Sequence, residues 1–250
     1  MNIGLYQSAA TLSALERWQD AVAQNITSAQ TTGYRKRTVQ FSTEAAGQWN
    51  LDPTGKSNSS GTDVPAVFTR TTSGINYTSG ETEPTNRDLD VAIQGDGFFE
   101  LKQPDGSLAY TRSGEFQVTA DRTLVTAGNC QVLSDSGSPI VLQPGGGNIT
   151  INHDGSIVQG TTTLGKLAIR TFSNPADLTP AAGGLFSAGA GAGMSTVAKP
   201  ELMQGYLEQS NVQPLREMVD LVLISRAYEA NQKSITSTDE QMQKTFDALG

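Results

Sequence analysis

The chain has 250 residues, of which 36% are hydrophobic, with a formal net charge of -8 and one cysteine. This length allows one large domain or two small ones. The excess of acidic residues argues against general nucleic-acid binding. The lone Cys130 excludes an internal disulfide, and no stretch approaches the roughly 18 apolar residues of a membrane-spanning helix.

The first segment with helical periodicity covers residues 3–29. Its apolar residues fall on two seven-residue registers, the a and d positions of a coiled coil. The helix is expected to end near Gln30, because Gly33 can take the positive φ that closes a helix. The predicted seam residues of this helix are Leu5, Leu12, Leu15, Val22 and Ile26.

The start of the chain does not have the features of a cleavable signal peptide. It has no basic n-region, and Glu16, Arg17 and Asp20 interrupt its apolar positions. The protein is therefore expected either to stay in the cytoplasm or to leave it by a route that reads no such signal.

The middle of the chain has the pattern of short strands and turns. Residues 34–72 are predicted to be an extended linker segment with a polar, exposed stretch from 44 to 63, and residues 73–204 a β-rich outer domain. Asp105-Gly106 and Asp154-Gly155 predict tight hairpin turns. The alternation of glycine and small residues from 181 to 195 predicts a flexible loop.

A second helical segment covers residues 211–249. Ser210 and Asn211 are candidate capping residues, and Pro214 suits the first turn. Its predicted seam residues are seven apart: Leu221, Tyr228, Ile235, Met242 and Leu249. The flanking register is partly polar and consists of Met218, Ser225, Gln232, Asp239 and Phe246.

Together these segments predict an α+β fold in which the terminal helices pair as a coiled-coil-like layer around a central antiparallel β domain. Residues 1–33 and 205–250 would form one discontinuous helical assembly domain. Narrow apolar stripes indicate helices that contact partners, and isolated helices of this length are marginal in water. The ends are therefore expected to order on assembly, although packing of the two helices within one soluble fold remains the alternative.

The sequence offers little for catalysis or cofactor binding. His153 is the only histidine, and Asp154 and Ser156 share its turn, a placement that does not hold triad geometry. One histidine and one cysteine cannot build a zinc site. No catalytic residue, cofactor or metal site is predicted, although a cation near Asp88, Asp90 and Asp96 stays open without a calcium-loop pattern.

Four segments in chain order resemble the flagellar basal-body rod and hook family of axial proteins. They cover residues 25–35, 89–99, 109–126 and 204–233, and the first departs from the family pattern at residues 26–28. The positions that carry the family motifs are Asn25, Gly33, Tyr34, Leu89, Asp90, Gly95, Gly97, Phe98, Asn211, Arg226, Tyr228 and Asn231.

The resemblance implies a non-enzymatic subunit that assembles helically into the rod, the drive shaft that transmits torque from motor to hook. It also implies export by the flagellar type III apparatus, a place in the periplasmic span of the basal body, and other rod, hook and basal-body subunits as partners. Proximal rod members are the most similar, and a distal rod or hook-type subunit is the alternative.

Two readings outside this family remain. The chain could be a β binding module with helical arms and one defined partner. It could also carry an enzyme on the β domain, in which case Asp88, Asp90 and Glu100 are the first candidates for catalytic carboxylates.

Overall fold

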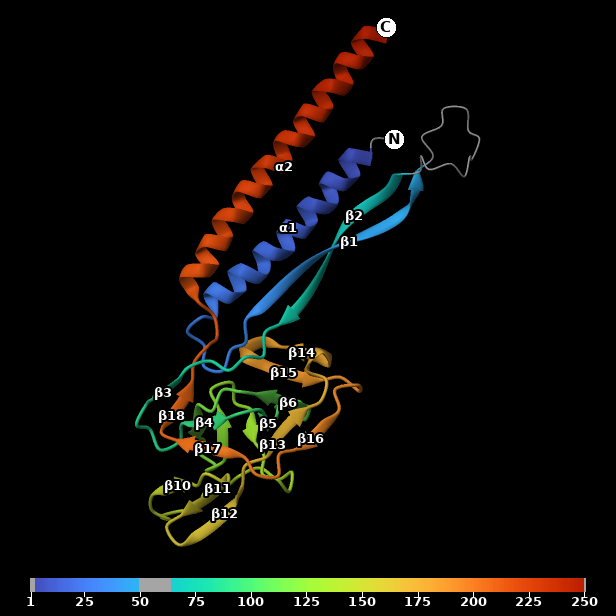
Figure 1. The fold of residues 1–250 in the computed structure, drawn as a ribbon. Coiled ribbons are helices and arrows are strands. Elements are labelled where there is room, and N and C mark those ends of the chain that lie inside the picture. The colour runs from blue at the N-terminus through green and yellow to red at the C-terminus, as the bar shows by residue number, and fades with distance from the viewer. Residues whose placement is uncertain (1–2, 50–63, 250) are drawn as a thin grey trace. The chain divides into compact units, whose positions relative to one another are not determined.

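The computed structural model describes residues 3–49 and 64–249 (Figure 1). Their contacts divide the chain into two compact units. The helical unit comprises Met1–Ile26, Arg37–Gly74 and Gln213–Gly250, and the β unit comprises Thr27–Lys36 and Ile75–Val212. The chain thus passes four times between the units, and each unit is assembled from segments that lie far apart in the sequence.

The helical unit contains α1 (Ile3–Thr27), α2 (Pro214–Leu249) and the two-stranded sheet of β1 (Arg37–Trp49) and β2 (Val64–Ile75). Figure 1 shows α1 and α2 side by side and running in opposite directions. Hydrogen bonds near both ends of α1 fix this order, because Asn25 contacts Glu217 and Ser8 contacts Asn231. The α+β class and the pairing of the two terminal helices are therefore confirmed.

A small apolar core holds the helical unit together. Leu15 and Val22 of α1 pack with Ile224 of α2. Trp18 of α1 also meets Phe41 of β1 edge to face, with ring centroids 5.5 Å apart. A two-stranded sheet alone is marginal in water, so this contact helps to explain how β1 and β2 are held. Residues 34–72, predicted to be an extended linker, contain β1 and most of β2.

The β unit is built from short strands in four sheets. The largest sheet has nine strands, with the path β14-β15-β6-β5-β9-β8-β7 and with β13 pairing both β5 and β16. A three-stranded sheet has the order β10-β11-β12, and β17-β4 and β18-β3 form two pairs. The strand pairs with a determined register are antiparallel, as predicted.

The strands of the β unit have the following bounds: β3 Thr82–Pro84, β4 Val91–Gln94, β5 Phe98–Lys102, β6 Leu108–Thr111, β7 Phe116–Val118, β8 Leu124–Thr126, β9 Gln131–Val132, β10 Ile149–Ile151, β11 Ser156–Gln159, β12 Thr162–Lys166, β13 Ile169–Phe172, β14 Leu178–Pro180, β15 Leu185–Ala188, β16 Met194–Thr196, β17 Glu201–Gln204 and β18 Tyr206–Glu208. Two short 3-10 helices cover Pro175–Asp177 and Ala182–Gly184.

Two apolar clusters form the core of the β unit. The larger includes Phe99, Leu101 and Phe116, and the smaller is an aromatic cluster around Phe98 and Phe186. Phe186 belongs to β15, so the prediction of a flexible loop over 181–195 was wrong. A glycine-rich composition gave the loop signal, but the buried aromatic ring supplies the contacts that order this segment.

The two Asp-Gly turns are confirmed. In the β5–β6 hairpin, the N–H of Gly106 donates to the carbonyl of Gln103 at 2.9 Å, and Gly106 has φ +88°. In the β10–β11 hairpin, the N–H of Gly155 donates to the carbonyl of Asn152 at the same distance, and Gly155 has φ +87°. Glycine meets no steric cost at this φ, which is why the Asp-Gly signal works.

Candidate assembly site

The β unit ties together the segments that lead to and from the helical unit. Residues 27–36, 75–80 and 205–212 are joined by a network of hydrogen bonds and ion pairs, which we call the clasp. We define the clasp by Gly33, Arg35, Lys36, Asn76, Thr78, Arg112, Glu208 and Asn211.

Glu208 is the charged centre of the clasp. Its carboxylate accepts from Arg35 Nη1 at 2.6 Å and from Arg112 Nε at 2.8 Å, and all three side chains are about 2% exposed. The backbone N–H of Gly80 adds a bond of 2.9 Å to the same carboxylate. Burial lowers the pKa of the Arg112 guanidinium, and the charge of Glu208 acts in the opposite direction. Because unpaired buried charges are costly, each member depends on the others.

Arg112 also accounts for two glycine positions of the family motif. Its guanidinium donates to the carbonyl oxygens of Gly97 at 2.6 Å and Gly95 at 2.8 Å. Both glycines have positive φ, +83° for Gly95 and +141° for Gly97. A Cβ on Gly97 would also lie 2.8 Å from the side chain of Ile169. This tight turn therefore presents its carbonyls to the buried cation.

Asn211 joins three segments through one amide. Its Oδ1 accepts from the N–H of Lys36 at 2.7 Å, and its Nδ2 donates to the carbonyls of Asn76 at 2.9 Å and Thr78 at 2.8 Å. The prediction that Asn211 caps the C-terminal helix therefore missed its role. At the start of α2, the carbonyl of Gln213 accepts from the N–H groups of Arg216 and Glu217.

Gly33 allows the chain after α1 to lie directly against the β unit. It has φ +69°, and a Cβ placed there would lie 2.4 Å from the backbone nitrogen of Ser113. Its own N–H donates to the carbonyl of Glu208 at 2.8 Å. Both the φ and the close approach require glycine. The residue was predicted to close a helix, but α1 already ends at Thr27.

The remaining motif residues occupy different environments. Tyr34 and Phe98 are buried, and Leu89 packs at the edge of the larger core. Asp90 is fully buried, and the nearest cation printed for it is Arg87, whose Nε lies 3.7 Å from its carboxylate. The helical-unit members differ again: Asn25 is buried, Tyr228 and Asn231 are half-buried, and Arg226 is exposed.

The structure places the predicted seam residues unevenly. Leu15 and Val22 are buried, and the half-buried positions are Leu12, Ile26, Leu221, Tyr228, Ile235 and Met242. The side chains of Leu5 and Leu249 lie outside those that the structure describes.

The companion register of α2 differs from the prediction. Met218, Ser225, Gln232 and Asp239 are exposed, whereas Glu217, Ile224, Asn231 and Thr238 face inward, and the side chain of Phe246 lies outside those described. Ile224 follows Leu221 by three residues, a spacing that should have identified it.

A second apolar face of α2 was not predicted. Five large apolar side chains near its start are exposed, from 49% for Leu223 to 78% for Leu215. They recur at helical spacing and are Leu215, Met218, Val219, Val222 and Leu223. We call this surface the outer stripe, since the opposite register of α2 packs on α1. Contiguous exposed apolar surface of this kind marks an interaction site.

The candidate catalytic and metal-binding residues have structural roles. His153 Nδ1 lies 2.8 Å from the carbonyl of Leu202, and Glu100 forms an ion pair with Arg170 at 2.8 Å. Asp88 and Asp96 are exposed while Asp90 is buried. Among the described residues, no group of three or more His, Cys, Asp or Glu side chains is placed to hold a metal ion.

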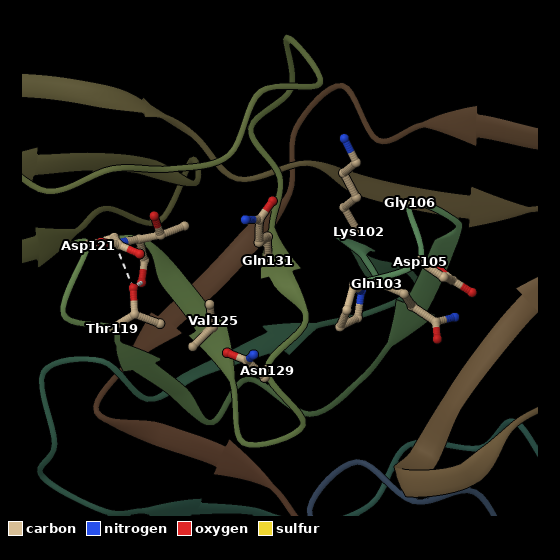
Figure 2. A pocket seen from close by; sticks show the side chains of 11 residues that line it. Lys102, Gln103, Asp105, Gly106, Thr119, Asp121, Val125, Asn129 and Gln131 are labelled. Carbon is tan, nitrogen blue, oxygen red and sulfur yellow. Dashed lines mark hydrogen bonds between the residues drawn. The ribbon is translucent and has the colours of Figure 1, made fainter.

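A hollow of about 460 Å³ lies on the β unit (Figure 2). Figure 2 shows that amide and hydroxyl groups dominate its wall, and its ionisable groups are Lys102, Asp105 and Asp121. Hydrogen bonds from Ser107 lower the pKa of Asp105. Asp105 is therefore held as a turn carboxylate and is poorly suited to donate a proton.

Known proteins resemble this chain over its whole length. A family model described as the flagellar hook protein FlgE/F/G D1 domain matches residues 92–159. Another, described as the flagellar basal body rod FlgEFG protein C-terminal, matches residues 203–248. No helix among the described residues is long and apolar enough to cross a membrane.

Three relatives show the extent of the similarity. The flagellar basal-body rod protein FlgG of Borreliella burgdorferi is 33% identical, with 95% of each chain covered. The rod protein FlgF of Caulobacter vibrioides is also 33% identical, with 100% of this chain and 99% of the relative covered. FlgG of Bacillus subtilis is 30% identical, with 96% of each covered. On this full-length similarity, the chain belongs to the family of flagellar basal-body rod proteins.

Proposed function

We propose that this chain is a non-enzymatic structural subunit that assembles helically into the flagellar rod and carries torque from motor to hook. Family membership supports the rod, and the outer stripe of α2 is the observation that carries assembly. Four apolar side chains of the stripe are more than half exposed in the single chain. Burying one such side chain contributes roughly 1.5–3 kcal/mol, so a second subunit that covers the stripe would gain substantially.

The outer stripe also explains why the seam residues alone do not suffice for assembly. Leu221 and Tyr228 already pack against α1 within the chain. Contacts to other subunits would therefore use the opposite register of α2, together with the exposed upper part of the helix. The prediction that seam residues such as Ile235 and Met242 contribute to assembly is kept, because both remain only half-buried.

The clasp gives the subunit a means of carrying load. The chain crosses between the units four times, and the connecting segments are bonded to one another around Glu208 and Asn211. A force applied to one connection would thus be shared among all of them. This supports a subunit in which the helical unit and the β unit both take part in the shaft.

The assembly proposal is tested by a pair of matched variants on α2. Met218→Ser with Val222→Ser removes apolar surface from the outer stripe, and Gln232→Ser with Lys233→Ser changes two exposed polar positions further along the helix. We expect the stripe variant to keep helical circular dichroism but to lose motility and incorporation into purified basal bodies. The control should keep both. Wild-type motility of the stripe variant would contradict the proposal.

We further propose that the subunit is of the FlgF kind and reaches the periplasmic span through the flagellar type III apparatus without cleavage. The 87–90 and 210–214 segments and the end-to-end match with a FlgF support this assignment. Expression in strains lacking either FlgF or FlgG tests it, with rescue of motility expected only in the first. Intact mass of the protein in basal bodies tests the uncleaved start, and a shortened N-terminus would contradict it.

A further inference from the structure

A polar pair lies inside the otherwise apolar contact between α1 and α2. Asn25 of α1 and Glu217 of α2 are each 1% exposed. The Nδ2 of Asn25 donates to Oε2 of Glu217 at 3.0 Å. Around them the contact is made by the apolar cluster of Leu15, Val22 and Ile224.

Asn25 is itself fixed in place by the backbone of β1. Its Oδ1 accepts from the N–H of Arg37 at 2.8 Å, and its Nδ2 also donates to the carbonyl of Arg37 at 2.9 Å. The amide thus has a fixed orientation before Glu217 is considered. Glu217 lies in the first turn of α2, where a negative charge is favourable.

We propose that Asn25 and Glu217 form the pair that specifies the register of the α1–α2 contact and reserves the inner face of α2 for α1. The seam repeats every seven residues, so its apolar positions alone would accept several alignments. Only the native alignment gives the buried carboxylate of Glu217 the amide of Asn25. In any other alignment the carboxylate would face apolar side chains, which is strongly unfavourable. A single polar position fixes coiled-coil register in the same way.

The inference goes beyond the proposed function because it concerns pairing within one chain and holds whether or not the protein forms a rod. It gives α2 two chemically distinct faces. The inner face carries a polar pair that only α1 can satisfy, and the outer stripe is apolar and selects less strictly. A second copy would therefore be directed away from the inner face.

Disulfide trapping in the full chain reports the register directly. Ser8 and Asn231 are in contact, since Asn231 Nδ2 donates to the carbonyl of Ser8 at 2.9 Å. Cysteines at these two positions report the native alignment. Cysteines at Ser8 and Thr238 report an alignment shifted by seven residues. Both reporters are made with Cys130→Ala, and cross-links within and between chains are separated on non-reducing gels at low protein concentration.

Two changes at the pair decide the result. Glu217→Met makes the position apolar while Asn25 keeps its bonds to Arg37, and we expect the shifted cross-link to increase at least tenfold over the Glu217 background. Exchanging the two residues, as Glu217→Ile with Ile224→Glu, moves the carboxylate by seven residues at constant composition. Here we expect the Thr238 reporter to cross-link faster than the Asn231 reporter. Glu217→Gln, which keeps an acceptor for Asn25, should retain the native pattern.

Several outcomes would overturn the inference. One is a folded Glu217→Met variant that cross-links only in the native alignment, and another is an exchange variant that still prefers the Asn231 reporter. Loss of helical circular dichroism in both variants also overturns it, because the pair would then support stability and not alignment. Motility plays no part in the assay, so its result stands apart from that of the assembly proposal.

Discussion

The two units of this protein differ in how much of their stability lies within the chain. The larger core of the β unit contains buried residues from strands across the whole unit, with a second aromatic cluster beside it. The buried apolar cluster of the helical unit consists of Leu15, Val22 and Ile224, and large apolar side chains remain exposed on α2. The β unit is thus built as an independent fold, whereas the helical unit leaves apolar surface for partners.

The strongest test of this contrast is truncation at the boundary between the units. Removing residues 1–26 takes away α1 but leaves the clasp, so we expect the β unit to unfold at an unchanged urea midpoint. Removing residues 1–36 also takes away Gly33 and Arg35 and leaves Glu208 with one fewer buried cation. We expect that protein to fold poorly or not at all, as judged by near-ultraviolet circular dichroism. Equal stability of both truncations would contradict the place of 27–36 in the β unit.

A point change in the clasp should destabilise the β unit from within. Glu208→Ala leaves the guanidinium groups of Arg35 and Arg112 buried without their carboxylate. Removing one partner of a buried ion pair costs about 3–5 kcal/mol in free energy of unfolding. Urea unfolding followed by near-ultraviolet circular dichroism measures the effect. Glu83→Ala is the control because Glu83 is exposed and accepts only a hydrogen bond from Gln209 among its printed contacts.

Adjacent residues of α2 separate the inner face from the outer stripe. Ile224 is 1% exposed and Leu223 is 49% exposed. We expect Ile224→Ala to cost about 2–5 kcal/mol in unfolding of the helical unit, measured as loss of helical circular dichroism on heating. Leu223→Ala should change that stability by less than about 0.5 kcal/mol but weaken incorporation into basal bodies. Similar melting of the two variants would mean that the faces are not distinct.

Periodicity in the sequence was enough to predict the broad architecture. Helical repeats identified α1 and α2, and Asp-Gly pairs identified the hairpins, because these signals depend on local backbone preferences. The register of α2 was harder to predict, since apolar residues occur on both sides of the helix near its start. Leu221 and Met218 are equally apolar, and only the packed structure shows that the first faces α1 and the second does not.

The clasp could be predicted only in part. Gly33 and Asn211 were singled out through the family resemblance, but their physical roles depend on Ser113, Lys36 and Asn76, which lie far away in the sequence. Arg112 and Glu208 were missed. Each is a charged residue next to a short strand that contributes to the core, and that position is a usable signal for a buried ion pair.

The smallest expected effect lies at the rim of the β unit, where a surface turn adds local order without contributing to the core. The hydroxyl and backbone N–H of Ser156 donate to the Asp154 carboxylate and lower its pKa. A carboxyl whose pKa is lowered by folding stabilises the native state above its unfolded pKa and loses that contribution as pH falls through the folded value. NMR titration should therefore show Asp154 titrating below the usual aspartate range, and Ser156→Ala should raise its pKa. Because the turn is exposed, the unfolding midpoint at neutral pH should hardly move in this variant. A large loss of stability would show that the β unit depends on its rim as well as on its core and clasp.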